Sequence, residues 1–325
     1  MLFMIKIERL ILQSMPFRFL SAKSKKIILP GFEGVPLYDV INFFIKQIRK
    51  VGFNERAAAI SFNFLMAIPA STIFLCTLIP YLPVSKLITR ELLQLTKDVT
   101  PNQNTYFLIR NFLEDFLNKP RSGLLSLGFF LAVFYASNAM MCVMRSFNKS
   151  LIYSTKRNFI ETRWMAIKLT TVVIVLILLS IGVLIMQGTI LQWLLNSLDM
   201  NSPGIEGAVK ILRWLIIISL FFYAIAFIYK YGPAVHKRWR LNSTGTIFAT
   251  SLMILTTIVF TFWVNKFGNF NKVYGSIGTL MILMVLVYVN SLVLLIGYEL
   301  NVSIHSLKIM ADEREKQEKD NIATA

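Results

Sequence analysis

The chain has 325 residues, of which 55% are hydrophobic and only 16% are charged, and its mean hydropathy is +0.61. Soluble globular proteins carry roughly 25% charged residues. The composition therefore excludes one or two water-soluble domains and favours a multi-span membrane protein, whose outer face is solvated by lipid. The 34 basic residues outnumber the 17 acidic ones, which suits nucleic-acid binding, an anionic lipid surface or positive loops that fix membrane orientation. Positive loops are the simplest explanation because they need no ligand.

Residues 1–56 are predicted to form a basic cytoplasmic region with one amphipathic helix. From Asp39 to Val51, apolar and polar residues fall on opposite faces of a helix. The apolar face carries Ile41, Phe44, Ile45, Ile48 and Val51, and the polar face carries Asn42, Lys46, Gln47, Arg49 and Lys50. Such a helix either lies in the membrane interface, held by its apolar face and by anionic lipid, or packs against the cytoplasmic face of the bundle.

Six segments are long and apolar enough to cross a bilayer, whose core is about 30 Å thick and needs about 20 helical residues. They run from about Ala57 to Tyr81, Ser122 to Met144, Met165 to Gln187, Leu212 to Tyr229, Gly245 to Val264 and Ser276 to Gly297. The predicted fold is an all-α, polytopic bundle of six transmembrane helices that occupies residues 57–297.

Two further regions lie outside the spans. Residues 82–121 are expected to form a short extracytoplasmic cap of two amphipathic helices, Val84–Val99 and Asn104–Leu117, divided by Pro101. Residues 298–325 form a cytoplasmic tail, and its polar part after about Ala311 is expected to be frayed.

The basic residues predict the orientation of the chain. Most of them lie before the first span, between spans two and three, between spans four and five, and in the tail. Cytoplasmic loops of membrane proteins carry an excess of lysine and arginine. Both termini are therefore expected in the cytoplasm.

Three asparagines fall inside spans, where polar groups are costly and often functional. Asn63, Asn138 and Asn290 lie about 9, 7 and 5 Å toward the cytoplasm from the middles of their spans, at 1.5 Å per residue. They are predicted to form one polar layer. The layer either joins helices by hydrogen bonds or lines a path for a substrate or ion.

Other residues extend this prediction. Pro69 is expected to kink the first span. Arg145 shares a helix face with Asn138, at the cytoplasmic mouth, and Arg145 and Glu299 are expected to reach the interface by snorkelling. The sixth span places small and polar residues on one stripe that should face protein: Ser276, Thr279, Leu283, Leu286, Asn290 and Gly297. No convincing buried acid is apparent for a proton relay.

Metal and phosphate sites are not predicted. The two cysteines, Cys76 and Cys142, and the two histidines, His236 and His305, lack the spacing of zinc ligands. The glycines of Tyr274–Gly278 lack the lysine or third glycine of a phosphate loop; Gly275 and Thr279 instead suit close helix packing.

Four segments carry recognisable motifs: ERAAAISFNFLMAIPASTIFLCTLIPYLP, FYASNAMMCVMRSFNKS, YKYGPAVHKRW and NKVYGSIGTLMILMVLVYVNSLVLLIGYELN. With these segments the chain resembles the YihY/BrkB family of bacterial inner-membrane proteins, from about Leu37 to Ser303. The matching positions are Tyr274, Gly275, Ser276, Gly297, Glu299 and Asn301. Pro233 and Gly278, in the same segments, are expected to serve packing or a kink. One departure is Val287, which precedes Tyr288 where the family usually carries tryptophan.

The resemblance implies a six-helix bundle in the cytoplasmic membrane and little chemistry, although some members carry an old ribonuclease label. Metal-dependent phosphodiester hydrolysis needs clustered His and Asp ligands outside the membrane, and the sequence offers no such cluster. An enzyme and a cofactor are therefore not expected.

Two functions are compatible with these features. The first is a transporter or lipid-translocating permease whose path is lined by Asn63, Asn138 and Asn290. The second is a non-transporting scaffold for envelope partners, with the outer cap as the docking surface. The expected partners are anionic lipids of the inner leaflet, not nucleic acid; a homo-oligomer and the identity of envelope partners stay open.

Overall fold

The computed structural model describes residues 31–32, 34–50, 52–81, 121–151, 155, 157–185, 203–235, 239–266 and 276–324, with separate positions between 89 and 115. Its regular elements are all helical within these ranges. They are α3 (Leu37–Lys50), α4 (Phe53–Leu78) with the 3-10 turn η1 (Ile79–Tyr81), α7 (Ser122–Asn148), α8 (Phe159–Ile185), α10 (Pro203–Tyr231), α11 (Thr244–Lys266) and α13 (Ser276–Thr324).

Six of these helices, α4, α7, α8, α10, α11 and α13, are long and apolar enough to span a membrane. The predicted all-α, six-helix membrane bundle is therefore confirmed. The helices begin earlier than the apolar runs do: α4 starts at Phe53 and α8 at Phe159. Polar residues such as Glu55 and Glu161 sit in these first turns, where a carboxylate is favourable beside the exposed N–H groups of a helix.

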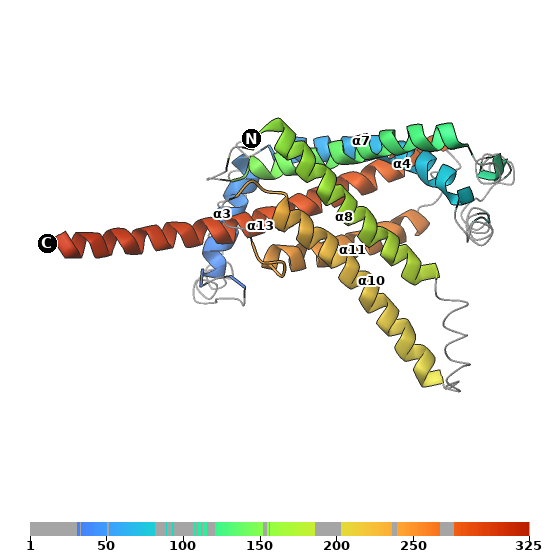
Figure 1. Ribbon diagram of the computed structural model, residues 1–325. Coiled ribbons are helices and arrows are strands. Elements are labelled where there is room, and N and C mark those ends of the chain that lie inside the picture. Colours follow the sequence, from blue (N-terminus) through green and yellow to red (C-terminus); the bar gives the residue numbers. More distant parts are fainter. Residues whose placement is uncertain are drawn as a thin grey trace, which may run out of the picture.

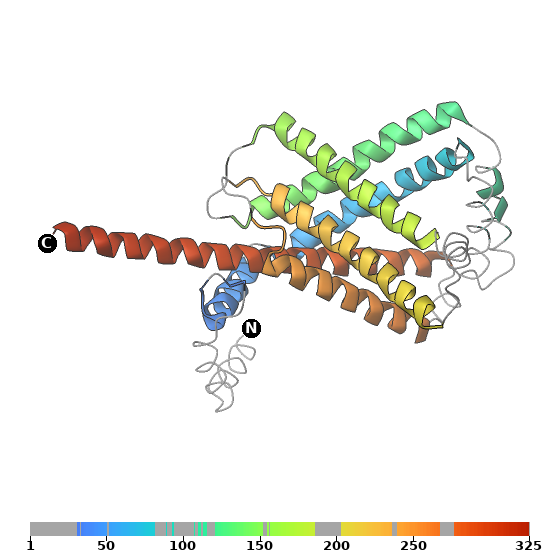
Figure 2. The ribbon, with the colours of Figure 1, turned by 60° about the horizontal axis from the view of Figure 1, so that its bottom comes forward.

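The six spans form a closed ring. Each packs against its neighbours in chain order, α4 on α7, α7 on α8, α8 on α10, α10 on α11 and α11 on α13, and α13 closes the ring against α4. Neighbours run in opposite directions. We call the side beside α3 the α3 end; there α4, α8 and α11 begin and α7 and α10 finish (Figures 1 and 2).

The main hydrophobic cluster lies toward the α3 end, while α4 and α7 stay buried against each other further along, at Cys76, Thr77, Gly128 and Ala132. The cluster contains Ala57 and Ile60 of α4, five residues of α7 and residues of the other spans. The five are Met140, Met141, Val143, Met144 and Phe147.

The helices gather at the α3 end and spread toward the opposite, far end (Figures 1 and 2). Large apolar side chains of the spans are exposed along their whole length, from Phe159 and Ile160 at the α3 end to Phe130 and Phe262 toward the far end, which is the pattern expected where lipid replaces protein as solvent.

Close packing of α11 on α13 depends on two glycines. A Cβ atom added at Gly297 would lie 2.5 Å from Cβ of Ala249 and 2.7 Å from the carbonyl oxygen of Gly245. Small residues at such a crossing let two backbones approach closely within a membrane. The predicted protein-facing position of Gly297 agrees with this contact.

The amphipathic helix α3 packs on the bundle and keeps an exposed apolar strip. Val40 is fully buried with Ile304 of α13, so the alternative of packing against the bundle is the one observed. Ile41 and Ile45, one turn apart, remain 46% and 44% exposed. This strip leaves the predicted contact with the membrane interface available.

The predicted cap helices, Val84–Val99 and Asn104–Leu117, lie almost wholly outside the described residues. At the described positions, Arg110 donates to Glu114 at 2.7 Å and Arg121 donates to Asp115 at 2.7 Å. Residues 1–30 also lie outside the described residues.

The expectation that the tail frays after about Ala311 was wrong. The helix α13 continues from the last span to Thr324 and projects beyond the bundle (Figure 1). Its last part, ADEREKQEKDNIAT, is rich in good helix formers. Opposite charges four residues apart, such as Asp312 with Lys316 and Arg314 with Glu318, add further support. The polar composition of this part indicates that it is exposed to water, but it does not disfavour a helix.

The glycine contact gives the first prediction. Gly297→Ala is expected to destabilise the purified chain by about 1–3 kcal/mol, because the new methyl group overlaps α11. Gly182→Ala on α8 is the matched control, since nothing lies within 4 Å of a Cβ at that position. Thermal unfolding in detergent measures both; equal effects of the two substitutions would contradict the close crossing.

Candidate functional site

Three aromatic rings meet in the interior at the α3 end. Phe147 of α7 stacks on Tyr298 of α13 with ring centroids 3.8 Å apart and planes 6° from parallel. Tyr229 of α10 meets both rings, with centroids 5.7 Å from Phe147 and 5.8 Å from Tyr298. All three side chains are buried. We call these three residues the aromatic seal.

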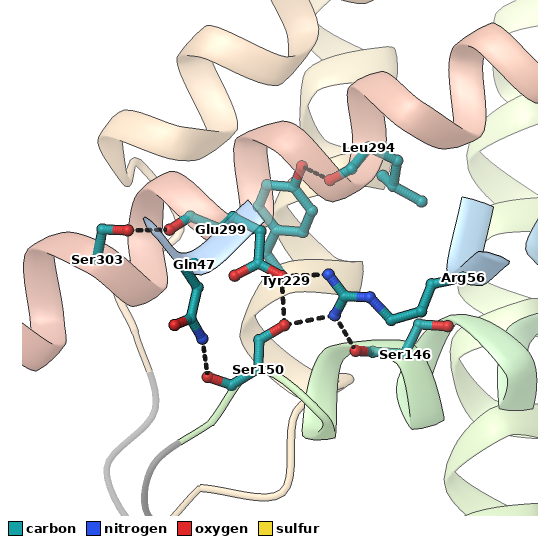
Figure 3. A network of polar contacts seen from close by, with 8 residues as sticks. All are labelled: Gln47, Arg56, Ser146, Ser150, Tyr229, Leu294, Glu299 and Ser303. Atoms are coloured by element: carbon teal, nitrogen blue, oxygen red, sulfur yellow. Dashed lines mark hydrogen bonds and ion pairs between the residues drawn. The ribbon is translucent and has the colours of Figure 1, made fainter. Parts of the chain in front are cut away.

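The aromatic seal fills the centre of the ring of helices. In the ring, α7, α10 and α13 are not neighbours, because α8, α11 and α4 lie between them. Side chains that touch across intervening helices must point inward. Tyr229 also donates its hydroxyl to the carbonyl oxygen of Leu294 at 2.6 Å, which ties α10 to α13 (Figure 3).

The exposure of the helix faces that carry the seal changes along the spans. Met140 and Ser291, seven residues or about two turns before Phe147 and Tyr298, are both only 4% exposed. Eighteen residues, or five turns, before each ring of the seal stand Phe129, Ile211 and Leu280, which share the seal's helix faces. Their exposed fractions are 46%, 65% and 56%. The faces that are buried at the seal are therefore exposed at these three positions.

A buried ion pair lies beside the seal. The guanidinium of Arg56 on α4 donates to the Glu299 carboxylate on α13, and both side chains are buried. Arg56 also donates to the carbonyl oxygen of Ser146 at 2.7 Å and to the hydroxyl of Ser150, which itself bonds to Glu299 (Figure 3). The network joins α4, the end of α7, and α13 at a single point.

Four polar atoms in this region have no hydrogen-bond partner among the described residues. They are Oε2 of Glu299, Nε of Arg56, the hydroxyl of Tyr298 and Nε1 of Trp239, whose ring lies 5.2 Å from that of Tyr298. Only one oxygen of the carboxylate is used, and in the view of Figure 3 the other faces away from Arg56. Unsatisfied buried polar atoms are unusual in native proteins and point to strain, to a function or to an unseen ligand.

Two expectations about Glu299 were therefore wrong. It does not snorkel to the interface, because Arg56 and Ser150 give its carboxylate partners inside the bundle. It is also the buried acid that the sequence did not reveal. Arg56 is one of the basic residues before the first predicted span. Its opposite charge to Glu299 at the same end of two spans was the available signal, but sequence does not place α4 against α13. Arg145, by contrast, is exposed near the end of α7.

Polar contacts also fix the connections around the site. Asn301 accepts the backbone N–H of Gly245 at 2.7 Å and donates to the hydroxyl of Ser243 at 2.8 Å, which caps the start of α11. Arg157 donates to the carbonyl oxygen of buried Pro233 at 2.9 Å, which holds the segment after α10 against the chain leading into α8. Asn301 and Arg157 thus stabilise the connections between helices.

The three asparagines are not joined by a hydrogen bond among the described residues. Asn63 donates to the carbonyl oxygen of Ala59 at 2.8 Å, and Asn290 donates to that of Leu286 at 3.0 Å, each within its own helix. Asn138 accepts a hydrogen bond from Arg163 of α8.

The positions of Asn138 and Asn290 along their helices can be compared with the position of the aromatic seal. Asn138 and Asn290 lie nine and eight residues before Phe147 and Tyr298, about 12–14 Å along their helices. Nine residues is two and a half turns, so Asn138 lies on the side of α7 opposite Phe147. A polar layer that lines a path stays a prediction.

The other predicted site residues have the following positions. Pro69 lies inside α4, and Gly278 is buried in α13. Tyr274 and Gly275 lie outside the described residues. In the part of the chain that is described, no group of three His, Cys, Asp or Glu side chains is arranged to hold a metal ion.

The ion pair gives the second prediction. Arg56→Ala is expected to lower the free energy of unfolding by about 3–5 kcal/mol, because it leaves the Glu299 charge buried and unpaired. Arg145→Ala, an exposed charge at the same end, should change it by less than about 0.5 kcal/mol. Denaturant unfolding in detergent measures both, and a small effect at Arg56 would show that Glu299 does not depend on it.

Comparisons with known proteins agree with the fold. The family model described as virulence factor BrkB matches residues 44–323. YfkH of Bacillus subtilis, a protein named as ribonuclease-like, is 28% identical over 259 residues, which cover 80% of this chain and 92% of YfkH. A UPF0761 membrane protein of Idiomarina loihiensis is 28% identical over 138 residues, 42% of this chain and 49% of that protein. One of Tolumonas auensis is 27% identical over 118 residues, 36% and 38% of the two chains. No solved structure matches. The chain is therefore a membrane protein of the BrkB family.

Proposed function

We propose that the chain is a transporter or lipid-translocating permease of the cytoplasmic membrane, with its path along the axis of the helix ring. The observation that carries this proposal is the change in exposure along one set of helix faces. These faces are sealed by Phe147, Tyr229 and Tyr298 and exposed at Phe129, Ile211 and Leu280. A ring open at one end and closed at the other is one of the two states that alternating access requires.

Orientation follows from the charged residues around the seal. The α3 end carries Arg56, Arg145, Lys149, Arg157, Arg163, Lys230 and Arg240 at or beside helix ends. The positive-inside rule favours this end as cytoplasmic. The proposed state is therefore open toward the outside, with both termini in the cytoplasm.

The chemistry of the open half favours an apolar or amphipathic substrate. Its exposed positions Phe129, Ile211 and Leu280 are large and hydrophobic. Asn290 stands about one turn above the most deeply buried interior residues of α13, so its amide could meet a polar head group. These features suit a lipid-like molecule better than a small ion, which would need polar ligands along its whole route.

The scaffold function remains the second candidate because of α13. Its last turns project beyond the bundle as a charged helix that ends at Thr324. Such a helix offers a surface to a cytoplasmic partner. The outer cap, the docking surface expected from the sequence, lies mostly outside the described residues. A non-enzymatic role is part of both candidates.

The aromatic seal gives the third prediction. Phe147→Ala in proteoliposomes is expected to speed the transbilayer movement of a fluorescent phospholipid by on the order of tenfold. Removing a buried aromatic ring costs about 3–5 kcal/mol of packing. The expected tenfold change corresponds to about 1.4 kcal/mol of that loss acting on the closed state alone. The control is Phe130→Ala, whose side chain is 67% exposed.

The readout is chemical quenching of the fluorescent lipid in the outer leaflet. Unaltered chain should move lipid faster than empty vesicles do, and Phe130→Ala should match it. Rates for all proteins equal to those of empty vesicles would contradict the permease proposal and favour the scaffold.

A further inference from the structure

A cation of α8 reaches α7 on the outer side of the helix ring. The guanidinium of Arg163 donates to the side-chain oxygen of Asn138, which lies on the side of α7 opposite the aromatic seal, and it stands 4.9 Å from the centre of the Phe134 ring. Asn138 comes ten residues before Asn148, where α7 ends, or about 15 Å along the helix axis. The positive charge of Arg163 is therefore placed well inside the spans and not at their ends.

No carboxylate neutralises the charge of Arg163 in the part of the chain that the structure describes. The salt bridges found there join other arginines to acidic residues. Glu161 stands two residues before Arg163, hence on almost the opposite side of α8, where its carboxylate accepts the backbone N–H of Asn158. An ionised side chain within a span is costly and is generally paired with a counter-charge. Arg163 thus lacks a counter-charge from the described residues.

The guanidinium of Arg163 also keeps donors that Asn138 does not use. An arginine side chain carries five N–H donors, and the oxygen of Asn138 accepts from one nitrogen. No nitrogen of Arg163 is among the enclosed polar atoms without a partner, and the residue is partly exposed. Its remaining donors therefore face the surroundings of the bundle, where a molecule of the membrane can reach them.

The face of α7 that receives Arg163 changes character along its length. Leu127, Phe134, Asn138 and Arg145 follow one another at intervals of seven, four and seven residues, so they share one face of the helix. We call these four positions the outer face of α7. Leu127 and Phe134, toward the far end, are apolar and exposed, whereas Arg145, toward the α3 end, is an exposed cation. The outer face of α7 therefore matches an amphiphile with an anionic head group toward the α3 end.

We infer that the outer face of α7 binds an anionic phospholipid, whose phosphate accepts hydrogen bonds from Arg163 and whose acyl chain lies along Phe134 and Leu127. A phosphate diester supplies the missing negative charge and an oxygen pair that matches the fork of a guanidinium. Arg145, two turns nearer the α3 end, favours a head group with net negative charge over a zwitterionic one. The site lies outside the ring, so it does not depend on the proposed path.

Native mass spectrometry of the full chain in detergent tests the inference by measuring the Kd of the first bound lipid. Phosphatidylglycerol is the anionic probe, and phosphatidylcholine, which is zwitterionic, is the reference. The unaltered chain is expected to bind phosphatidylglycerol about tenfold more tightly than phosphatidylcholine, because a charge-assisted contact to the head group is added. Equal affinity for the two lipids would overturn the inference.

Arg163→Gln should raise the Kd of phosphatidylglycerol about tenfold, because glutamine can still donate to Asn138 but carries no charge. If Arg163 served only to fasten α8 to α7, this variant would bind the lipid as the unaltered chain does, and the inference would fail. The matched control is Arg240→Gln, which removes an exposed cation before α11 at the same end of the bundle. Its Kd should stay unchanged; a loss equal to that of Arg163→Gln would show general attraction between charges and no defined site.

A second variant decides the matter if Arg163→Gln fails to assemble. Arg145 is exposed, so Arg145→Gln should leave the fold intact. It is expected to weaken the binding of phosphatidylglycerol about fivefold and to leave that of phosphatidylcholine unchanged. An unchanged Kd for phosphatidylglycerol in this variant would contradict binding on the outer face of α7.

A water-soluble phosphate separates a lipid from a free anion. Glycerol phosphate in large excess should not displace phosphatidylglycerol, because it has no acyl chain to contact Phe134 and Leu127. Displacement that requires Arg163 would assign the site to a soluble phosphate and overturn binding of lipid. These measurements involve no transport, so a failure of the lipid-movement assay would refute the permease and leave this site in place.

Discussion

Contacts between side chains that reach across the helix ring hold this bundle together, and they occur at one end. Phe147, Tyr229 and Tyr298 pack against one another although their helices are not neighbours. In a membrane the hydrophobic effect gives helices little reason to associate, because lipid tails are as apolar as the side chains. Van der Waals contact between flat rings and a few buried polar bonds must therefore supply specificity. Where those contacts stop, above Met140 and Ser291, the faces of the spans become exposed.

The buried ion pair has a different role from the rings. Replacing a buried pair by apolar side chains often leaves stability unchanged or raises it, so Arg56 and Glu299 are weak evidence for a purely stabilising function. An ion pair in which one carboxylate oxygen and one guanidinium nitrogen have no hydrogen-bond partner among the described residues is poorly suited to a purely stabilising role. It is better suited to a contact that must break and form again.

The sequence predicted what depends on one helix at a time. Length and hydropathy located six spans, and the amphipathic pattern located α3. It could not predict which spans touch, so it did not pair Arg56 with Glu299 or bring Phe147 onto Tyr298. The asparagines attracted notice because an amide is conspicuous among apolar residues, whereas phenylalanine and tyrosine are not. The expected fraying of the tail was wrong because exposure to water does not by itself disfavour a helix, and the residues of the tail favour one.

The central claim is that the interior is closed at the α3 end and open at the far end, and a cross-linking comparison tests it most directly. In a chain without its native cysteines, a short bismaleimide is applied to Phe147→Cys with Tyr298→Cys, and separately to Phe129→Cys with Leu280→Cys. The second pair lies five turns further along the same two helices and faces. The account predicts that the first pair is joined within one chain and the second is not. Efficient joining of the second pair, or none of the first, would contradict it.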